Sequence, residues 1–236
     1  MASRSDNMST LNLPANSPRS SDLAMAHDFR AENLSLNRGS RRLFADLSFS
    51  VSGGEVLILR GANGIGKTSL LRVLVGLTAP DTGSMFWNRQ HLKPLDSVAR
   101  SLMLYVAHAN AIKDELTAFE NLQEALRLDG LPSAAITTEA LLPILEELGL
   151  LKSRHLPARK LSQGQKRRIG LARLAFARKI FWLLDEPTNA LDSEGVSLFT
   201  GIVNRHLARG GIACIASHLP MQFVGKSREI TLEKST

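Results

Sequence analysis

Short hydrophobic runs separated by polar turns dominate the first part of the chain. Hydrophobic positions that alternate with polar ones, or run together briefly, predict strands over residues 29–36, 43–51, 56–60, 84–87 and 102–107. Turn-forming residues separate these strands at positions 37–40, 53–54 and 80–83. The leucine- and valine-rich stretch 69–77 predicts a helix that follows the third strand after a glycine-rich loop.

The pattern becomes helical from residue 117. Thr117 and Glu120 form a capping box that opens one helix. A second helix ends at Gly149, and Pro143 either shifts its start or kinks it, because proline cannot donate a backbone hydrogen bond. We therefore expect residues 110–158 to form a helical insertion between strands.

After residue 158 the chain returns to alternating helices and strands. Ser162 and Gln165 form a second capping box, ahead of a basic helix over residues 166–178. The apolar run 181–186 predicts a strand that ends in two acids. A further helix follows Asp192, and a last strand around Cys214 ends before His218.

Composition restricts the class of protein. The chain has 236 residues, enough for one domain or two closely joined ones. Its single cysteine excludes an intramolecular disulfide, and Cys214 lies in an apolar run that predicts a buried thiol. No apolar stretch approaches the roughly 20 residues of a membrane span, so other chains must cross the membrane if the protein works there.

The formal net charge of +7 suits nucleic acid, anionic lipid headgroups or nucleotide phosphates. Aromatic residues make up only 5% of the chain, and none is interleaved with basic clusters as a base-stacking surface requires. We therefore expect no nucleic-acid partner.

Residues 1–28 are rich in Ser, Asn and Pro and lack hydrophobic periodicity, which is typical of a disordered tail. They contain neither the apolar core of a secretory signal nor the composition of a transit peptide. Translation could equally begin at Met8 or Met25, and we assign this tail no function.

The strongest chemical signal is the run Gly61-Ala62-Asn63-Gly64-Ile65-Gly66-Lys67-Thr68, which fits the phosphate-binding P-loop pattern. Its glycines let backbone N–H groups turn towards a polyphosphate, and the following helix N-terminus favours negative charge. Lys67 would reach the β- and γ-phosphates, Thr68 would bind Mg²⁺, and Ser69 could bond the α-phosphate. A chance glycine-rich turn would match in roughly one chain in a hundred at ordinary glycine content.

Two acids and a histidine follow strand ends of the same predicted sheet. Asp185 closes the strand 181–186, at the edge where parallel sheets bind ligands, and would hold Mg²⁺ through water. Glu186 can face the γ-phosphate and polarise a water molecule. An acidic turn is the alternative for these two residues. His218 follows the last strand, so it could approach the same phosphate, although a lone histidine there is usually structural.

Together these motifs resemble those of ATP-binding-cassette (ABC) ATPases, in the family's order and from about Phe29 onwards. Residues 61–68 are similar to the Walker A loop and 181–185 to Walker B, with Glu186 as the catalytic glutamate. Residues 161–165 resemble the signature motif, with Gln163 in place of its first glycine. Residues 190–192 resemble the D-loop, and His218 the switch histidine.

The resemblance implies an α/β P-loop NTPase fold, RecA-like, with a mostly parallel sheet core, an antiparallel β subdomain and a helical insertion subdomain. The core would comprise residues 29–107 and 159–236, and the helical subdomain residues 108–158. The resemblance also implies ATP and Mg²⁺ as ligands, and a second copy of the chain across the ATP sites. The signature residues Ser162, Gly164 and Gln165 would then contact ATP held by the partner.

Two positions depart from the family pattern. Arg38 occupies the region of the aromatic residue that stacks on adenine; a guanidinium plane can also stack on a base, and a solvated charge is the alternative. His108 stands where the family has a glutamine that touches Mg²⁺ and the attacking water. Histidine differs from glutamine because it titrates near neutral pH.

The runs 108–113, 116–122, 165–168 and 171–174, together with a chain that ends soon after 217–220, resemble the ATP-binding subunit of the haem exporter of cytochrome c maturation. That resemblance implies integral-membrane partner subunits and a peripheral location on the cytoplasmic face of a bacterial inner membrane. The alternatives are a cassette for another cargo, a soluble cassette ATPase that acts on ribosomes or DNA, and a nucleotide switch without hydrolysis.

Overall fold

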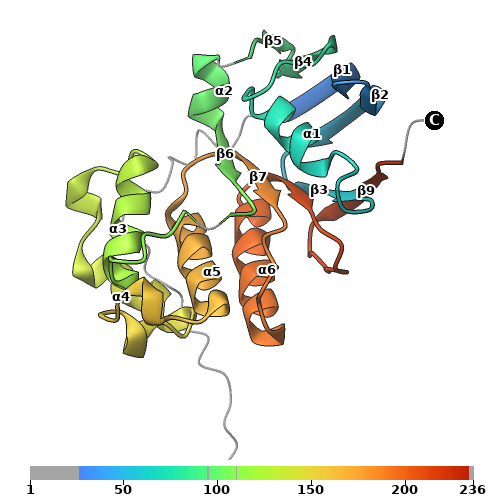
Figure 1. Cartoon of the computed structure of the whole chain (residues 1–236). Coiled ribbons are helices and arrows are strands. Elements are labelled where there is room, and N and C mark those ends of the chain that lie inside the picture. Colours follow the sequence, from blue (N-terminus) through green and yellow to red (C-terminus); the bar gives the residue numbers. More distant parts are fainter. Residues whose placement is uncertain (1–26, 95, 110, 234–236) are drawn as a thin grey trace, which may run out of the picture.

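Two β-sheets organise the part of the chain that the computed structural model describes, which is residues 27–94, 96–109 and 111–233 (Figure 1). One sheet is antiparallel with strand order β2-β1-β4-β5. The other has the order β6-β7-β8-β3-β9, and its strand pairs are all parallel. The α/β fold class predicted from the sequence is therefore confirmed.

The strands are β1 (Asp28–Arg38), β2 (Arg41–Ser52), β3 (Glu55–Arg60), β4 (Thr82–Trp87), β5 (Gln90–Leu92), β6 (Met103–Val106), β7 (Phe181–Asp185), β8 (Ile212–Ala216) and β9 (Lys226–Thr231). The α-helices are α1 (Lys67–Leu74), α2 (Ser97–Leu102), α3 (Ala118–Leu128), α4 (Thr138–Glu147), α5 (Gln163–Ala172) and α6 (Ser193–Ala208). Short 3-10 helices are η1 (Ser133–Ala135), η2 (Leu151–Ser153), η3 (Ala158–Lys160) and η4 (Arg173–Phe176). The sequence prediction missed β5, α2 and β9.

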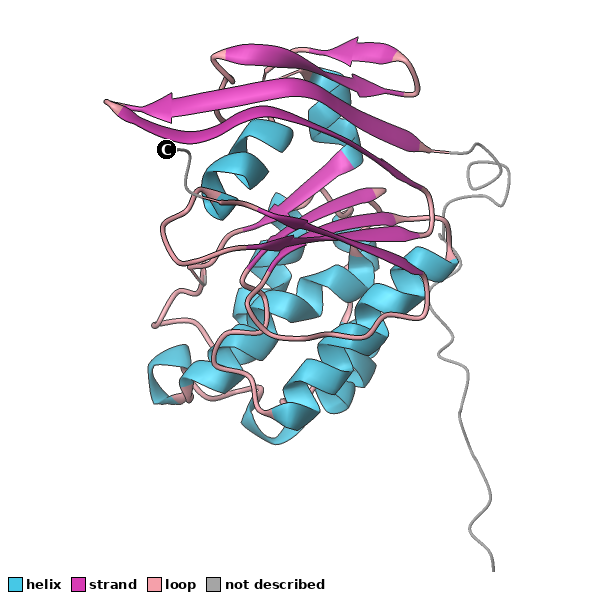
Figure 2. Ribbon diagram, turned by 90° about the vertical axis from the view of Figure 1, so that its right-hand side faces the viewer, coloured by secondary structure: helices cyan, strands magenta, loops and turns pink. Residues whose placement is uncertain are grey.

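The parallel sheet separates two hydrophobic cores, because successive side chains of a strand point to opposite faces. On β3, Leu57 and Leu59 face the core that contains α1 and the antiparallel sheet. Val56 and Ile58 face the core shared with α3–α6. Figure 2 shows the resulting layers, with α1 between the two sheets and the larger group of helices on the far side of the parallel sheet.

Both predicted capping boxes are present. At α3, the Glu120 N–H donates to Thr117 Oγ1 at 3.2 Å, and the Thr117 N–H donates to Glu120 Oε2 at 2.8 Å. At α5, the corresponding distances between Ser162 and Gln165 are 3.1 Å and 2.9 Å. These bonds satisfy N–H groups that have no partner within the helix, so Thr117 and Ser162 are the N-caps of α3 and α5.

Three helix predictions need correction. The helix predicted over residues 166–178 begins earlier, at Gln163, and its α-helical part ends at Ala172, where η4 takes over before the turn into β7. Helix α1 begins at Lys67 rather than at Ser69, because Gly66 is its N-cap. Helix α4 begins at Thr138, so Pro143 lies inside it and does not shift its start; the helix buries Leu141, Ile144 and Leu145, and this packing offsets the lost backbone bond.

Three further predictions concern the N-terminal tail, the single cysteine and membrane-spanning segments. Most of the predicted disordered tail, residues 1–26, lies outside the described residues, whereas Asp28 is the first residue of β1. Cys214 is buried in β8 as predicted, and burial raises the pKa of its thiol above the ordinary value. Over the residues that the structure describes, no helix is both long and apolar enough to cross a membrane.

Candidate functional site

The glycine-rich loop turns between the carboxyl end of β3 and the start of α1. Within the loop, the Ile65 N–H donates to Ala62 O at 3.2 Å, and the Ile65 side chain is buried. Gly66 has a φ of 125°, and a Cβ atom there would lie 3.3 Å from Leu43 Cβ. A side chain at this position would therefore be strained and crowded, which explains why the sequence has glycine immediately before Lys67.

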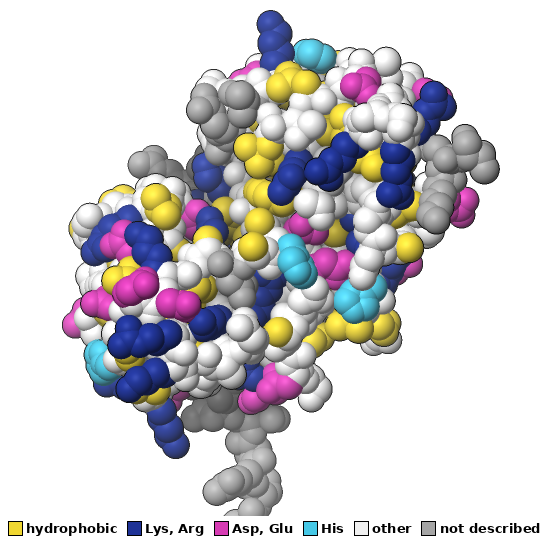
Figure 3. Space-filling model, in the orientation of Figure 1, with side chains coloured by type: hydrophobic (Ala, Val, Ile, Leu, Met, Phe, Trp, Pro, Cys, Tyr) yellow, Lys and Arg dark blue, Asp and Glu magenta, His cyan; other side chains and the backbone are white. Residues whose placement is uncertain are grey.

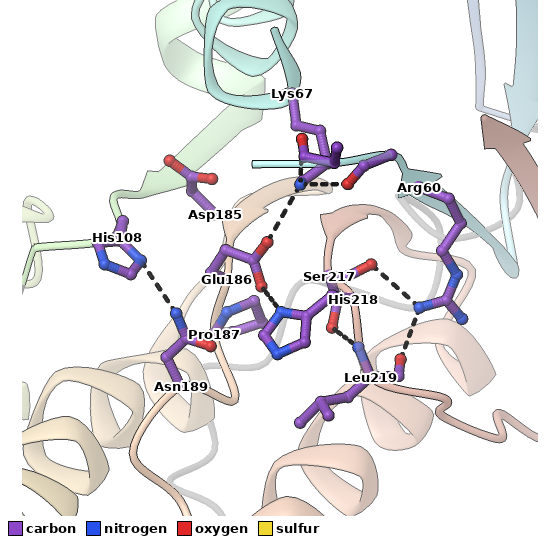
Figure 4. A network of polar contacts seen from close by, with 12 residues as sticks. Arg60, Lys67, His108, Asp185, Glu186, Pro187, Asn189, Ser217, His218 and Leu219 are labelled. Atoms are coloured by element: carbon purple, nitrogen blue, oxygen red, sulfur yellow. Dashed lines mark hydrogen bonds and ion pairs between the residues drawn. The ribbon is translucent and has the colours of Figure 1, made fainter. Parts of the chain in front are cut away.

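Lys67 is buried inside the loop that precedes it. Its Nζ donates to Gly61 O at 2.7 Å and to Ala62 O at 3.4 Å, and lies 3.5 Å from Glu186 Oε1 (Figure 4). Only 6% of Lys67 is exposed. A buried ammonium group needs anionic or carbonyl partners; the loop supplies two carbonyl groups, and Glu186, which follows β7, supplies the carboxylate.

Thr68 and Asp185 bring two kinds of oxygen together from distant parts of the chain. Thr68 Oγ1 lies 2.9 Å and 3.1 Å from the two carboxylate oxygens of Asp185, which is 1% exposed. Ser69 follows Thr68 in the first turn of α1. A hydroxyl and a carboxylate are ligands that Mg²⁺ prefers, so these residues fit the predicted metal position.

Glu186 connects the loop to the last strand end of the site. Its Oε2 lies 3.0 Å from His218 Nδ1, while its other carboxylate oxygen faces Lys67 (Figure 4). The Glu186 N–H donates to Ala216 O at 2.9 Å, which fixes the residue beside β8. Lys67, Glu186 and His218 therefore form one continuous row of polar contacts, although they come from three separate segments.

Arg60 is a residue of this region that sequence reasoning missed. Its Nη1 donates to Ser217 O at 3.0 Å and to Leu219 O at 2.6 Å, and so holds the carbonyl groups of the residues before and after His218 (Figure 4). Its Nη2 also pairs with Glu229 Oε1 on β9 at 2.8 Å. No sequence pattern indicates this role, because Arg60 only ends a hydrophobic strand.

Arg167 is a second missed residue, although it lies only two positions after the signature-like motif. Its guanidinium is buried beneath the ends of β6 and β7. Burial lowers the pKa of Arg167, and the negative charges of Asp185 and Glu186 act in the opposite direction. Burial also raises the pKa of Tyr105 on β6, and the charge of Asp185 adds to that effect.

The signature-like motif lies on the other side of the parallel sheet from α1. Ser162 is the N-cap of α5, and its hydroxyl accepts from the Gln165 N–H. A Cβ atom on Gly164 would lie 2.9 Å from Ala190 O, so this position needs glycine because the first turn of α5 closely approaches the segment after β7. Because α5 packs in the core opposite α1, Ser162, Gly164 and Gln165 do not join the P-loop within one chain.

The two unusual residues lie at the edges of the site. Arg38 is exposed at the tip of the β1–β2 hairpin, opposite Arg41, and its guanidinium makes no hydrogen bond or ion pair with any other described residue. His108 is exposed after β6, and its Nδ1 lies 3.3 Å from Asn189 Nδ2 (Figure 4). Among the described contacts, His108 therefore joins the two loops after β6 and β7, and its role towards Mg²⁺ or water stays a prediction.

Comparison with known proteins decides the family. The family model described as ABC transporter matches residues 44–189, which include the P-loop, the signature-like motif and both acids. This chain belongs to the ABC transporter family. The family resemblance and the ATPase class that the sequence predicted are thereby confirmed.

Several curated relatives share more than 40% of their aligned residues with this chain. The cytochrome c biogenesis ATP-binding export protein CcmA of Nitrosomonas europaea is 46% identical over 188 residues, which cover 80% of this chain and 87% of the relative. The protein of the same name from Dechloromonas aromatica is 43% identical over 203 residues, which cover 86% and 98%. The protein of the same name from Haemophilus influenzae is 41% identical over 192 residues, which cover 81% of this chain and 89% of the relative.

Solved structures of ABC transporter proteins share the fold. An ATP-binding protein from Pyrococcus furiosus has a TM-score of 0.73 at 21% identity, and the match covers 86% of this chain and 96% of that one. The ATP-binding cassette MJ0796, solved as a dimer bound to ADP and Pi, has a TM-score of 0.68 at 22% identity, covering 81% and 88%.

Proposed function

We propose that this chain is the ATP-hydrolysing subunit of a haem exporter in cytochrome c biogenesis, and that it works with integral-membrane subunits. The observation that carries the catalytic part is the row formed by Lys67, Glu186 and His218 beside the Thr68–Asp185 pair. The similarity to CcmA export proteins over most of the chain supports the cellular role.

Each residue of the row has a distinct task in phosphoryl transfer to water. Lys67 and the P-loop N–H groups bind the phosphates and neutralise their charge, which is the main contribution of the protein to this chemistry. Thr68 and Asp185 would hold Mg²⁺, which supplies further positive charge at the phosphate oxygens when bound.

Glu186 is placed to orient and deprotonate the attacking water. Glu186 is only 8% exposed, and its carboxylate contacts Lys67 Nζ on one side and His218 Nδ1 on the other. A general base must be held in hydrogen-bond reach of the proton it accepts. His218 positions Glu186 in this scheme, and Arg60 in turn holds the peptides around His218.

A second copy of the chain would complete the site. Ser162, Gly164 and Gln165 pack on the opposite side of the sheet from the P-loop, so only another chain can bring them to the same ATP. The dimeric arrangement of the MJ0796 cassette supports this assembly. A closed two-fold pair uses the same surface on both copies.

We further propose that the protein lies on the cytoplasmic face of a bacterial inner membrane and docks through the residues from 108 to 158. On the face shown in Figure 3, Lys and Arg side chains are spread over the upper and lower-left parts, and acidic ones are mixed among them in the lower-left part. That mixture favours a protein partner over a uniformly anionic surface such as nucleic acid.

Co-purification tests this proposal directly. The Glu186→Gln variant should stay bound to ATP, so complexes from detergent-solubilised membranes should contain it together with integral-membrane proteins that mass spectrometry identifies. Lys67→Ala, which removes phosphate binding, is the matched control. Recovery of membrane subunits of another exporter would reassign the cargo, and recovery with ribosomes or DNA alone would contradict the membrane role.

A further inference from the structure

The guanidinium of Arg167 contacts two strand ends at once. Only 2% of this residue is exposed. Its Nη2 donates to Glu186 O at 2.8 Å and to Asp185 O at 3.2 Å, and its Nε donates to Pro187 O at 2.9 Å. Its Nη1 donates to His108 O at 3.1 Å and to Ala107 O at 3.3 Å. One side chain from α5 thus holds backbone carbonyls from the loops after β6 and β7.

Glu186 needs such support because its backbone is strained. Its φ is 46°, in the left-handed region that side-chain-bearing residues avoid. A strained residue keeps its conformation only when the surroundings fix it, and such residues gather at active sites. The Glu186 carbonyl accepts from Arg167 Nη2 and from the Asn189 N–H, at 2.8 Å and 3.2 Å.

We propose that Arg167 is a positioning residue for ATP hydrolysis, which fixes the strained backbone of Glu186 and ties it to the loop after β6. This inference rests on the proposed ATPase function. Arg167 acts on Glu186 through the backbone, because it donates to the Asp185, Glu186 and Pro187 carbonyl groups. The loop it holds leads through residues 111–117 into α3, so the same contact joins the hydrolytic residue to the segment expected to dock the membrane subunit.

Arginine suits this task better than lysine does. A guanidinium presents five N–H groups in a rigid plane, whereas an ammonium is a point charge with three donors. Arg167→Lys keeps the charge but can serve only some of the five carbonyls. Arg167→Met keeps the length and the apolar stem but leaves all of them without this donor. The two variants therefore form a graded series.

Arg173 offers a matched control from the adjoining turn. It is also an arginine in a partly buried ion pair, and its Nε donates to Asp129 Oδ2 at 2.7 Å while its Nη2 contacts the other carboxylate oxygen. This pair ties η4 to the end of α3, away from the ends of β6 and β7. Arg173→Met should lower stability as a lost buried arginine does, without loosening the backbone of Glu186.

The test uses the full-length chain and its complex with membrane subunits. We expect kcat to fall on the order of a hundredfold in Arg167→Met and less in Arg167→Lys, because small displacements of catalytic groups have such effects. The Kd for ATP should stay within about threefold, since the P-loop is untouched. Hydrogen exchange at the Glu186 and Asn189 amides should accelerate at least about tenfold in Arg167→Met, and not in Arg173→Met.

Several results would overturn the inference. Wild-type kcat in folded Arg167→Met would do so, and so would an equal loss of kcat in Arg173→Met, or unchanged exchange at Glu186 and Asn189. The exchange measurement does not depend on hydrolysis. Faster exchange in Arg167→Met together with an inactive wild-type complex would therefore uphold the positioning role and reject the proposed ATPase function instead.

Discussion

Acid should destabilise this protein through His206 already between pH 7 and pH 5, above the ordinary pKa values of the carboxyl groups. His206 lies in the last turn of α6, and its ring stacks on Trp182 of β7 with centroids 3.7 Å apart and planes 8° apart. Its Nε2 lies 3.1 Å from Ile212 O. Burial lowers its pKa from 6.5 to about 4, so the folded state favours neutral imidazole.

The sign and size of the effect follow from proton linkage. Between pH 6.5 and about 4 the unfolded chain binds a proton that the folded chain does not, so the free energy of unfolding falls as the pH falls. One pKa unit corresponds to about 1.4 kcal/mol, which gives about 3 kcal/mol over the whole window. About 2 kcal/mol of this should be lost between pH 7 and pH 5.

Urea unfolding followed by circular dichroism at pH 7 and pH 5 measures this loss. His206→Gln is the matched variant, because its amide can donate to Ile212 O but stays neutral at both pH values. We expect the variant to be less stable than wild type at pH 7 and to show a much smaller change between the two pH values.

Other titrating groups can be kept out of the comparison. Hydrogen bonds lower the pKa values of Asp192 and Glu229, whose stabilisation is present above their ordinary values of 3.8 and 4.5 and is lost as the pH falls further. Measurements at pH 5 and above avoid most of that loss. Equal pH dependence of wild type and His206→Gln would refute the assignment to His206.

Three further predictions concern ATP. Glu186→Gln should keep ATP binding while turnover falls on the order of a hundredfold or more, as radiolabelled phosphate release would show; wild-type turnover would reassign the base. Arg38→Ala should weaken ATP binding by about 0.5–2 kcal/mol in calorimetry and Arg38→Tyr should restore it; equal affinities would make Arg38 a surface charge. His108→Gln should retain turnover, because its amide oxygen can accept from Asn189; a large loss would show that the imidazole itself is needed.

The chemistry of individual segments was predictable because it is local. The P-loop, the strand before it and the capping boxes at Thr117 and Ser162 depend on residues a few positions apart, and the structure has them as predicted. The acids of the site were predictable for a related reason: a hydrophobic strand that ends in Asp185 and Glu186 marks the ligand-binding edge of a parallel sheet.

What the sequence did not reveal depends on contacts between distant segments. Strand β9 has a mostly polar, exposed sequence. Among the described strands it pairs with β3 alone, which precedes it by about 170 residues, so no local pattern predicts it. The roles of Arg60 and Arg167 were not predictable from local sequence for the same reason. Each donates to carbonyl groups whose positions are fixed only when several strand ends meet.

The neighbours of β3 also determine when the nucleotide site can form during synthesis. The antiparallel hairpin of β1 and β2 needs only residues 28–52, so it can form soon after it leaves the ribosome. Strand β3 instead pairs with β8 and β9, the last two strands of the described chain. Almost the entire polypeptide must therefore be synthesised before β3, the strand that precedes the P-loop, has a neighbour on both sides. A chain that stops before Lys226 would contain every sequence motif of the ATPase but would lack β9. Strand β3, which leads into the P-loop, would then have β8 as a neighbour on one edge and no β9 on the other.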